Sequence, residues 1–209
     1  MVSTEQLVTT EMEKDIGVLV SENLKPSKQC EKAARTAQGV LTQVLRALSY
    51  RDQTVLPKIF AQYVRPHLEF AIQAWAPWQR GDINLIEDVQ RRMVRQVTGL
   101  QGRTYEERLD ELGMVTMERR RRAQDLVQAH KILHEVDDVD SRTWSERPDQ
   151  NQHRTRKAEW GLRQSGYPPR LELQKNFFSQ RVVTEWNNLP GPIRSTKSLN
   201  EFKSFLYKE

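Results

Sequence analysis

Apolar side chains recur along most of the chain at the spacing of a helical face. Between residues 25 and 135 they fall three or four positions apart in successive runs, which predicts amphipathic helices with one buried face each. The first run begins at Ser27, its expected N-terminal cap, and ends at about Leu48. The second begins after Asp52, also an expected cap. Pro66 interrupts it and predicts a kink or a new helix start, because proline lacks an N–H and disfavours helix at the preceding residue.

Three further helix starts carry capping residues. Asp82 is the expected cap of the run that follows it, and Thr104 and Glu107 have the spacing of a capping box. Thr116 opens a long helix that should end before Val136, because the aspartates beyond that point would face the negative end of the helix dipole. The composition agrees with helices, since 29% charged residues accompany 37% hydrophobic ones and only nine glycines occur. We therefore predict a mainly α fold.

Two segments depart from the helical spacing. Residues 6–20 predict two short strands around a turn at Thr10–Glu13, with Gly17 between alternating apolar positions. Because a two-stranded hairpin is only marginally stable in water, another sheet or a helix should lie beside it. Residues 141–170 are polar and basic, contain three prolines and indicate a poorly ordered linker. Residues 171–209 predict a small C-terminal helical unit.

The carboxylates and histidines give no pattern of a catalytic or metal site. Asp137 and Asp138 follow a predicted helix end rather than a strand, so we interpret them as a solvated acidic loop and not as a polymerase pair. His130 and His134 are one helical turn apart and could share a metal ion, but the sequence offers no third ligand nearby. We expect His130 to face the core, with His134 more exposed. We assign no catalytic residue, no metal site and no cofactor.

Cysteine content and hydropathy restrict the compartment. Cys30 is the single cysteine, which excludes an internal disulfide framework and favours a reducing environment. No apolar run approaches the length of about 18 residues that a membrane span needs, and the first twenty residues do not resemble a secretory signal. The expectation is a soluble chain of the nucleus or cytoplasm, neither secreted nor membrane-bound.

Charge is unevenly distributed within the net +5 of the chain. Residues 1–24 hold five acidic groups and one basic group, whereas residues 25–80 hold nine basic and three acidic groups. A basic block on a helical unit is typical of proteins that bind the phosphate backbone of nucleic acid. Many other soluble proteins are equally basic, so the charge by itself leaves the partner open.

Two other groups of residues allow more than one interpretation. Arg119–Arg122 fit a solvated helix surface, a phosphate contact or a nuclear import signal, and four successive helical residues cannot all face one duplex. Trp144 and Trp160 lie near basic residues in the predicted linker and could stack on bases of a single strand. Trp75 and Trp186 fall in register with apolar helix faces, which favours core packing.

An ordered series of short motifs resembles one protein family. They are EKDIGVLVS at residues 13–21, SYRD at 49–52, YVRPHLEFAIQAWAP at 63–77, IEDVQRR at 86–92, HKILHEVDDVD at 130–140 and KNFFSQRVVTEWNNLP at 175–190. Together they resemble the C-terminal third of non-LTR retrotransposon reverse transcriptases, the jockey-like and chicken-repeat-type elements in particular. The resemblance covers nearly the whole chain and weakens between residues 141 and 170.

This resemblance implies a division of the chain and a set of site residues. Residues 1–24 would be a remnant of the palm, 25–100 a thumb-like helical bundle and 101–140 a post-thumb helical unit, followed by the linker and the C-terminal unit. The primer-grip-like residues would be Lys14, Asp15, Ile16, Gly17 and Val18. The thumb would follow the backbone of an RNA–DNA or DNA duplex without reading bases, through Lys25, Lys28, Lys32, Arg35, Arg91, Arg92 and Arg95.

The same resemblance limits the expected activity. The family's catalytic aspartates, and the Mg²⁺ ions that they hold, would belong to a part of the palm upstream of Met1, as in a truncated element. We therefore expect a fragment of an RNA-directed DNA polymerase that is inactive by itself and binds template–primer nucleic acid non-specifically. The alternative is a helical protein-interaction module without a nucleic-acid function. The unpaired edges of the N-terminal hairpin also predict self-association.

Overall fold

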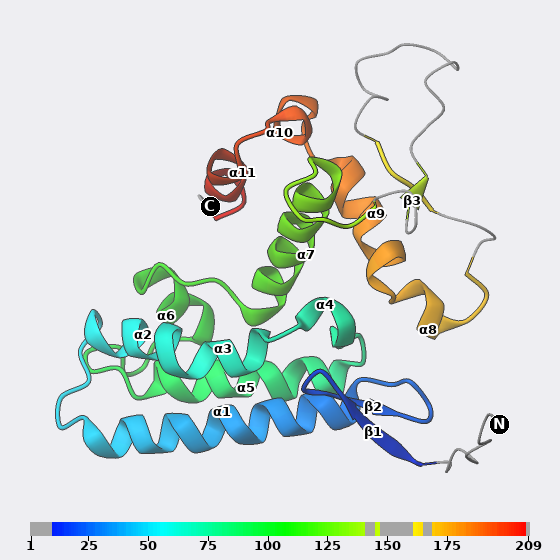
Figure 1. Cartoon of the computed structure of the whole chain (residues 1–209). Coiled ribbons are helices and arrows are strands. Elements are labelled where there is room, and N and C mark those ends of the chain that lie inside the picture. Colours follow the sequence, from blue (N-terminus) through cyan, green and yellow to red (C-terminus); the bar gives the residue numbers. More distant parts are fainter. Residues whose placement is uncertain (1–9, 141–144, 147–160, 165–168, 208–209) are drawn as a thin grey trace. The chain divides into compact units, whose positions relative to one another are not determined.

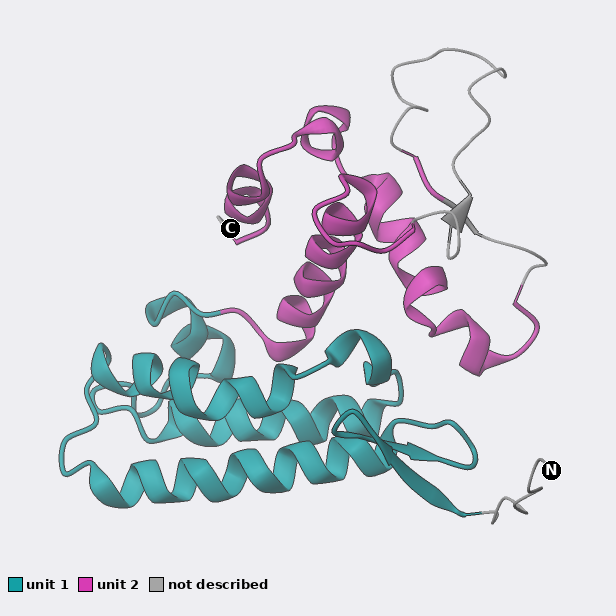
Figure 2. Ribbon diagram, in the orientation of Figure 1, with its two compact units in different colours: residues 1–114 teal, residues 115–209 magenta. Residues whose placement is uncertain are grey.

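The computed structural model describes residues 10–140, 145–146, 161–164 and 169–207. The protein is mainly helical, with an N-terminal two-stranded antiparallel hairpin followed by helices, so the predicted fold class is confirmed (Figure 1). It divides into two compact units, residues 1–114 and 115–209 (Figure 2), and each is described by itself. Within the described part, no helix is long and apolar enough to cross a membrane.

Two long helices form the base of unit 1, where α1 packs along α5 (Figure 1). The bounds of the helices in this unit are α1 Ser27–Ala47, α2 Val55–Ile59, the π-helix η1 Phe60–Val64, α3 Arg65–Glu69, α4 Ile72–Trp75, α5 Arg80–Arg95 and α6 Tyr105–Glu111. On α1 the buried face is rich in alanine, at Ala33, Ala34 and Ala37, and small side chains allow neighbouring helices to approach closely. The large core residues opposite include Phe60, Leu68 and Met93.

The proline-containing helix is interrupted where the sequence predicts. A single π-helical turn, η1, separates α2 from α3, and Pro66 is the second residue of α3. At that position the missing N–H costs little, because the first turn of a helix has no intrahelical acceptor for it. The wider π-turn thus accommodates the proline, and α2, η1 and α3 follow one another without an intervening loop.

The strands of the hairpin are β1 Met12–Asp15 and β2 Val18–Ser21, with Asp15 opposite Val18. The turn therefore lies at Ile16–Gly17, and the predicted turn at Thr10–Glu13 is wrong. Both turn residues have positive φ, 43° for Ile16 and 89° for Gly17, as a type I′ hairpin turn requires. The pattern concealed this turn because a β-branched residue such as isoleucine rarely adopts that conformation.

Helix α1 lies beside the hairpin, as expected because an isolated two-stranded hairpin is only marginally stable. Val18 of β2 is buried, and the Leu19 N–H donates to Gln29 Oε1 of α1 at 2.9 Å. The outer strand, β1, is exposed along its whole length. The hairpin is therefore supported on one edge by α1 and pairs with no further strand in the described chain.

Expected helix caps fall into two groups. The local motifs are confirmed: Asp52 Oδ1 accepts from the Thr54 and Val55 N–H groups at 2.7 and 2.6 Å, and Thr104 forms its capping box with Glu107. The caps predicted at Ser27 and Asp82 are wrong. Both residues lie inside the first turns of their helices, where the Ser27 hydroxyl donates to Asp82 Oδ2 at 2.7 Å. A contact between α1 and α5 thus replaces two local caps.

Unit 2 is built around one helix, α7 Met117–Leu133, whose cap at Thr116 and end before Val136 are confirmed. Its other elements are β3 Ser145–Glu146, β4 Arg163–Gln164, α8 Glu172–Lys175, α9 Phe178–Asn188, α10 Gly191–Ser195 and α11 Leu199–Tyr207. Helix α7 packs against α9 and α11, and they share one core made of Leu126, Ala129, Leu133, Leu162, Val182, Val183, Trp186 and Phe202. The C-terminal helices thus share a compact unit with α7, whereas α6 belongs to unit 1.

One part of the expected linker contributes to this core. Leu162 is buried, and its backbone N–H and carbonyl bond to the Asn187 side chain at 2.9 and 2.8 Å. Strands β3 and β4, of two residues each, pair in antiparallel fashion. Trp144 and Trp160, the residues considered for base stacking, lie outside the described residues, whereas Trp75 and Trp186 are buried as predicted.

Candidate nucleic-acid interface

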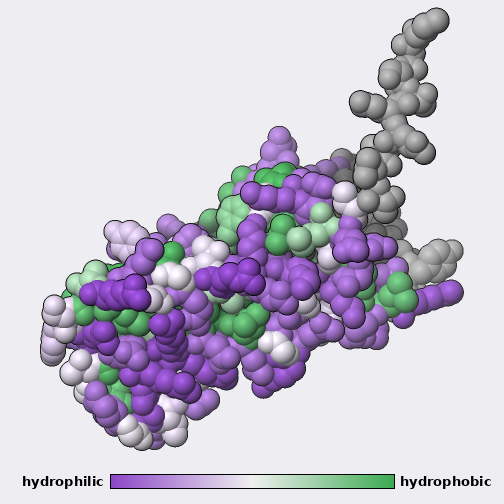
Figure 3. All heavy atoms as spheres, turned by 90° about the horizontal axis from the view of Figure 1, so that it is seen from below, coloured by the Kyte–Doolittle hydropathy of each residue, from purple (hydrophilic) through white to green (hydrophobic). Residues whose placement is uncertain are grey.

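A row of basic side chains follows the face of α1 that points away from the core. Its members are Lys28, Lys32, Arg35 and Arg46, which we call the α1 basic row. From Lys28 to Arg46 the row extends over 18 residue steps of helix, or about 27 Å at 1.5 Å per step. Glu31 is the single acidic residue of α1, and it pairs with Lys28 at 3.3 Å. Hydrophilic residues predominate in Figure 3, which is seen from below Figure 1 and hence from the side of α1.

Lys25 lies just before this row, in the loop that leads into α1. Its backbone N–H donates to Asn23 Oδ1 at 2.9 Å, and its carbonyl accepts from the Ser21 hydroxyl at 3.0 Å. These bonds hold the loop, and the Lys25 residue is exposed. Lys25 is thus a positive charge between the hairpin and the basic row.

Lys32 connects the basic row to the hairpin turn. Its ammonium Nζ donates to the Gly17 carbonyl at 2.7 Å. On another side the glycine faces an aromatic ring, because a Cβ atom at Gly17 would lie 3.3 Å from Cε1 of Phe70. The predicted thumb-like and primer-grip-like residues therefore meet at this point.

The tip of the hairpin is apolar, exposed and strained. Ile16 has 87% of its surface exposed and a φ of 43°, a left-handed conformation that costs a non-glycine residue about 1–3 kcal/mol. Its neighbours Lys14 and Asp15 are also exposed, whereas Val18 is buried. The residues predicted to be primer-grip-like thus present one strained apolar side chain directly after two exposed charged ones.

The three predicted arginines of α5 do not form one surface. Arg91 Nη1 pairs with Asp88 at 3.0 Å, and its guanidinium lies 5.1 Å from the centre of the Tyr105 ring of α6. Arg92 instead donates to Gln38 Oε1 of α1 at 2.6 Å. Arg95 is exposed and has no polar partner in the described part of the chain. The arginines therefore diverge toward α6, toward α1 and into solvent.

A buried polar cluster explains the position of Arg91. The Tyr105 hydroxyl donates to Glu87 and accepts from Gln90 Nε2, and burial together with Glu87 raises the pKa of Tyr105. These residues fix α6 on α5. The cluster is structural, and no local motif predicts it, because Tyr105 and Glu87 lie eighteen positions apart in the sequence.

Two arginines that are not among the predicted site residues lie close to Arg92. Arg46 and Arg51 line a cavity with Arg92 near the C-terminal ends of α1 and α5. Arg46 could have been found, because it lies eleven positions after Arg35 and thus three turns along the same helix face. Arg51 could not, since its place depends on how the chain reverses after α1.

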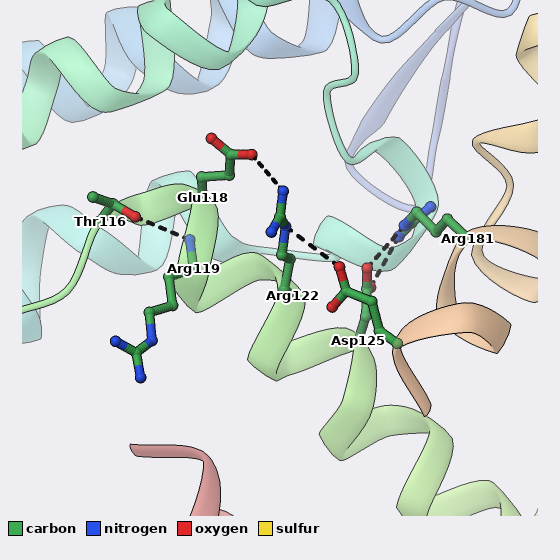
Figure 4. Close-up of polar contacts among 7 residues, drawn as sticks. Thr116, Glu118, Arg119, Arg122, Asp125 and Arg181 are labelled. Atoms are coloured by element: carbon green, nitrogen blue, oxygen red, sulfur yellow. Dashed lines mark hydrogen bonds and ion pairs between the residues drawn. The ribbon is translucent and has the colours of Figure 1, made fainter. Parts of the chain in front are cut away.

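The arginine run of unit 2 is largely engaged within the unit. Arg121 is buried, and Arg122 pairs with Glu118 at 2.8 Å and Glu185 at 3.4 Å. Figure 4 shows Arg122 and Glu118 next to the ion pair between Arg181 and Asp125. The run therefore spreads around α7, as expected for four successive helical residues, and gives no single basic face.

His130 of α7 and His134, which directly follows α7, contact backbone carbonyls of α10 and of the segment after it. His130 is completely buried as predicted, its Nε2 lies 2.8 Å from the Thr196 carbonyl, and its ring stacks on Phe202. His134 Nε2 lies 3.0 Å from the Arg194 carbonyl. Burial lowers the pKa of His130. Within the described ranges, no group of three potential ligand side chains could hold a metal ion.

No match to the chain was found among protein-family models, curated proteins or solved structures. The functional assignment therefore depends on the residues and geometry described above and on the resemblance of the motifs.

Proposed function

We propose that this protein holds a nucleic-acid duplex by its phosphate backbone, as the template–primer-holding part of a non-LTR retrotransposon reverse transcriptase. The observation that carries the proposal is the bond between Lys32 and Gly17, because it joins the α1 basic row to the primer-grip-like turn. The contacts would be to phosphates and would carry no sequence information. Polymerisation is not part of the proposal, and no residue is assigned to it.

The dimensions of the α1 basic row suit a duplex. Each strand of a duplex places one phosphate about every 3.4 Å along its axis, so a row of about 27 Å faces several phosphates in succession. Lys28, Arg35 and Arg46 are exposed. Lys32 uses one ammonium hydrogen on Gly17, and a lysine has three. Four contacts are therefore sterically available along one helix.

The salt dependence of binding tests this proposal. Neutralising phosphates releases counterions, and log affinity falls by about 0.9 per contact for each unit of log salt. For about four contacts we expect a slope of about −3 to −4, measured by fluorescence anisotropy on an RNA–DNA duplex between 50 and 200 mM salt. If the duplex does not bind at 50 mM salt, or if its affinity does not change with salt concentration, the proposal is wrong.

A second function, protein interaction, is favoured by the apolar surface near the hairpin. Met12, Ile16 and Phe70 are 48%, 87% and 54% exposed, and strand β1 has one edge without a strand partner in the described chain. Such an edge can pair with another chain, so the partner would be a second copy or another strand-bearing protein. Sedimentation over a range of concentrations checks for self-association. Salt-independent oligomers without duplex binding would favour this alternative.

A further inference from the structure

A cavity of about 530 Å³ opens at the C-terminal ends of α1 and α5. It is lined by Thr42, Leu45, Arg46, Leu48, Ser49, Arg51, Arg92 and Gln96, and we call it the α1–α5 pocket. Three of these residues are arginines and none is acidic. The nearest acidic residue in sequence, Asp52, caps α2 with its carboxylate and does not line the pocket.

Two of the three guanidinium groups are held in place by the protein. Arg51 donates from Nη1 to Gln96 Oε1 at 2.7 Å and from Nη2 to the Leu45 carbonyl at 2.9 Å. Its Nε is buried and has no acceptor among the described residues. Arg92 is fixed by Gln38. Arg46 is exposed and makes no hydrogen bond or ion pair in the same part of the chain, so it can move toward a ligand.

Basic residues at these helix ends also have a structural explanation. Ser27 meets Asp82 near the start of both helices and Gln38 meets Arg92 further along, so α1 and α5 run in the same direction. Both negative dipole ends therefore lie at the pocket, and each corresponds to about half a charge. Three arginines exceed the resulting total of about one negative charge. The pocket thus keeps a positive surplus that the dipoles do not account for.

We propose that the α1–α5 pocket binds a phosphate monoester or inorganic phosphate. A monoester carries about −1.5 to −2 charges and three terminal oxygens, which three guanidinium groups can share, whereas a backbone phosphodiester carries one charge. Ser49 adds an exposed hydroxyl, while the Thr42 hydroxyl already donates to the Gln38 carbonyl. The pocket volume leaves space beyond the phosphate for an attached sugar, as at the 5′ end of a nucleic-acid strand. This inference does not depend on duplex binding along α1.

Titration of the full chain with inorganic phosphate tests the pocket, with calorimetry as the readout and sodium chloride holding ionic strength constant. We expect saturable binding that falls about tenfold in Arg46→Gln, as for loss of one hydrogen bond between charged groups. Lys58→Gln is the control, since Lys58 is an exposed basic residue of α2 outside both the pocket and the α1 basic row, and it should bind phosphate like the unaltered protein. No saturable binding, or equal loss in both variants, would overturn the inference.

A second arm identifies the source of the phosphate. Two duplexes of one sequence, with a 5′-phosphate or a 5′-hydroxyl, are compared on the full chain and on Arg46→Gln. A preference for the phosphorylated end that Arg46→Gln abolishes supports a strand end as the ligand; equal affinity together with phosphate binding supports a small phosphate compound. Salt-dependent binding of both duplexes without phosphate binding would overturn the pocket and leave the proposed function standing.

Discussion

Lys32 Nζ donates a hydrogen bond of 2.7 Å to the carbonyl oxygen of Gly17, and this bond ties the middle of a basic helix face to the turn of the N-terminal hairpin. The charge of Lys32 is therefore placed by the hairpin, and the hairpin turn is placed by α1. A ligand that contacts the row at Lys32 would therefore lie next to the hairpin turn. Disturbing either residue should affect the other, which makes the relationship testable.

Removing the lysine should loosen the hairpin while leaving the helices intact. In Lys32→Met the Gly17 carbonyl loses its charged donor, a loss of about 1 kcal/mol for a partly buried bond. Hydrogen exchange should accelerate at the β2 amides and stay unchanged in α5. Lys28→Met, which removes an exposed lysine that pairs with Glu31, is the control and should leave the hairpin amides protected. Equal protection in both variants would contradict the linkage.

Relieving the strain at the hairpin tip should stabilise the protein. Asparagine tolerates positive φ far better than isoleucine, so Ile16→Asn should raise the free energy of unfolding of unit 1 by about 1 kcal/mol. Ile16→Val keeps the β-branch and should change it little. Urea unfolding of the three proteins provides the comparison. If Ile16 contacts the ligand, Ile16→Asn should bind more weakly although it is more stable; a less stable Ile16→Asn would show that the side chain packs rather than protrudes.

Acid should destabilise unit 2 through His130. Burial lowers the pKa of this histidine below its unfolded value of about 6.5, so the unfolded chain binds the proton more readily. The stability is therefore fully present above pH 6.5 and is lost as pH falls toward the lowered pKa. A proton there must sit at Nδ1, which is buried without an acceptor in the described part of the chain, because Nε2–H already donates to Thr196.

Unfolding of unit 2 measured from pH 8 to pH 5 checks this prediction. The decline should be smaller in His130→Gln, whose amide can still donate to the Thr196 carbonyl and does not titrate. His67→Gln is the control, because His67 is an exposed residue of unit 1. An unchanged decline in His130→Gln would assign the acid sensitivity to other groups.

The pair between Arg181 and Asp125 should be the most sensitive polar contact of unit 2. Their two side chains are 18% and 11% exposed and form hydrogen bonds of 2.8 and 2.9 Å (Figure 4). Asp125→Ala leaves the Arg181 charge partly buried without its partner, which should cost about 3 kcal/mol. Burial raises the pKa of Asp125, which shows that its charge is held at some cost in desolvation.

A double-mutant cycle with Arg181→Met isolates this interaction. The double variant should be less destabilised than the sum of the two single variants, because neither charge is then left alone. The exposed pair of Lys175 with Glu172 serves as a control, and Glu172→Ala should cost about 0.5 kcal/mol or less. Additive effects at Arg181 and Asp125 would show that packing alone matters there.

Local signals were sufficient for much of the fold. The caps at Asp52, Thr104 and Thr116 and the break at Pro66 depend on residues within one helical turn of each other, and the structure confirms them. The buried position of His130 followed from the helical spacing of its neighbours. Features of this kind are set by backbone hydrogen bonding and by which face of a helix is apolar.

The features that local signals did not predict depend on tertiary contacts. Ser27 and Asp82 were predicted as helix caps, but their side chains instead form a hydrogen bond between the parallel helices α1 and α5. The hairpin turn was misplaced because an isoleucine holds a conformation that sequence statistics assign to asparagine or glycine. In the candidate site, Arg91 and Arg92 share a sequence motif and nevertheless face α6 and α1 respectively. Arg51 reaches its pocket only through the chain reversal after α1.

Binding of an RNA–DNA duplex by a double variant of the α1 basic row tests the central claim most directly. Lys28→Gln with Arg35→Gln removes two exposed charges of the row, and Lys58→Gln removes an exposed lysine of α2 as the control. We predict that the double variant reduces the slope of log affinity against log salt by about 1.8, for all duplex sequences alike, while Lys58→Gln leaves it unchanged. An unchanged slope in the double variant would contradict the claim that α1 holds the phosphate backbone.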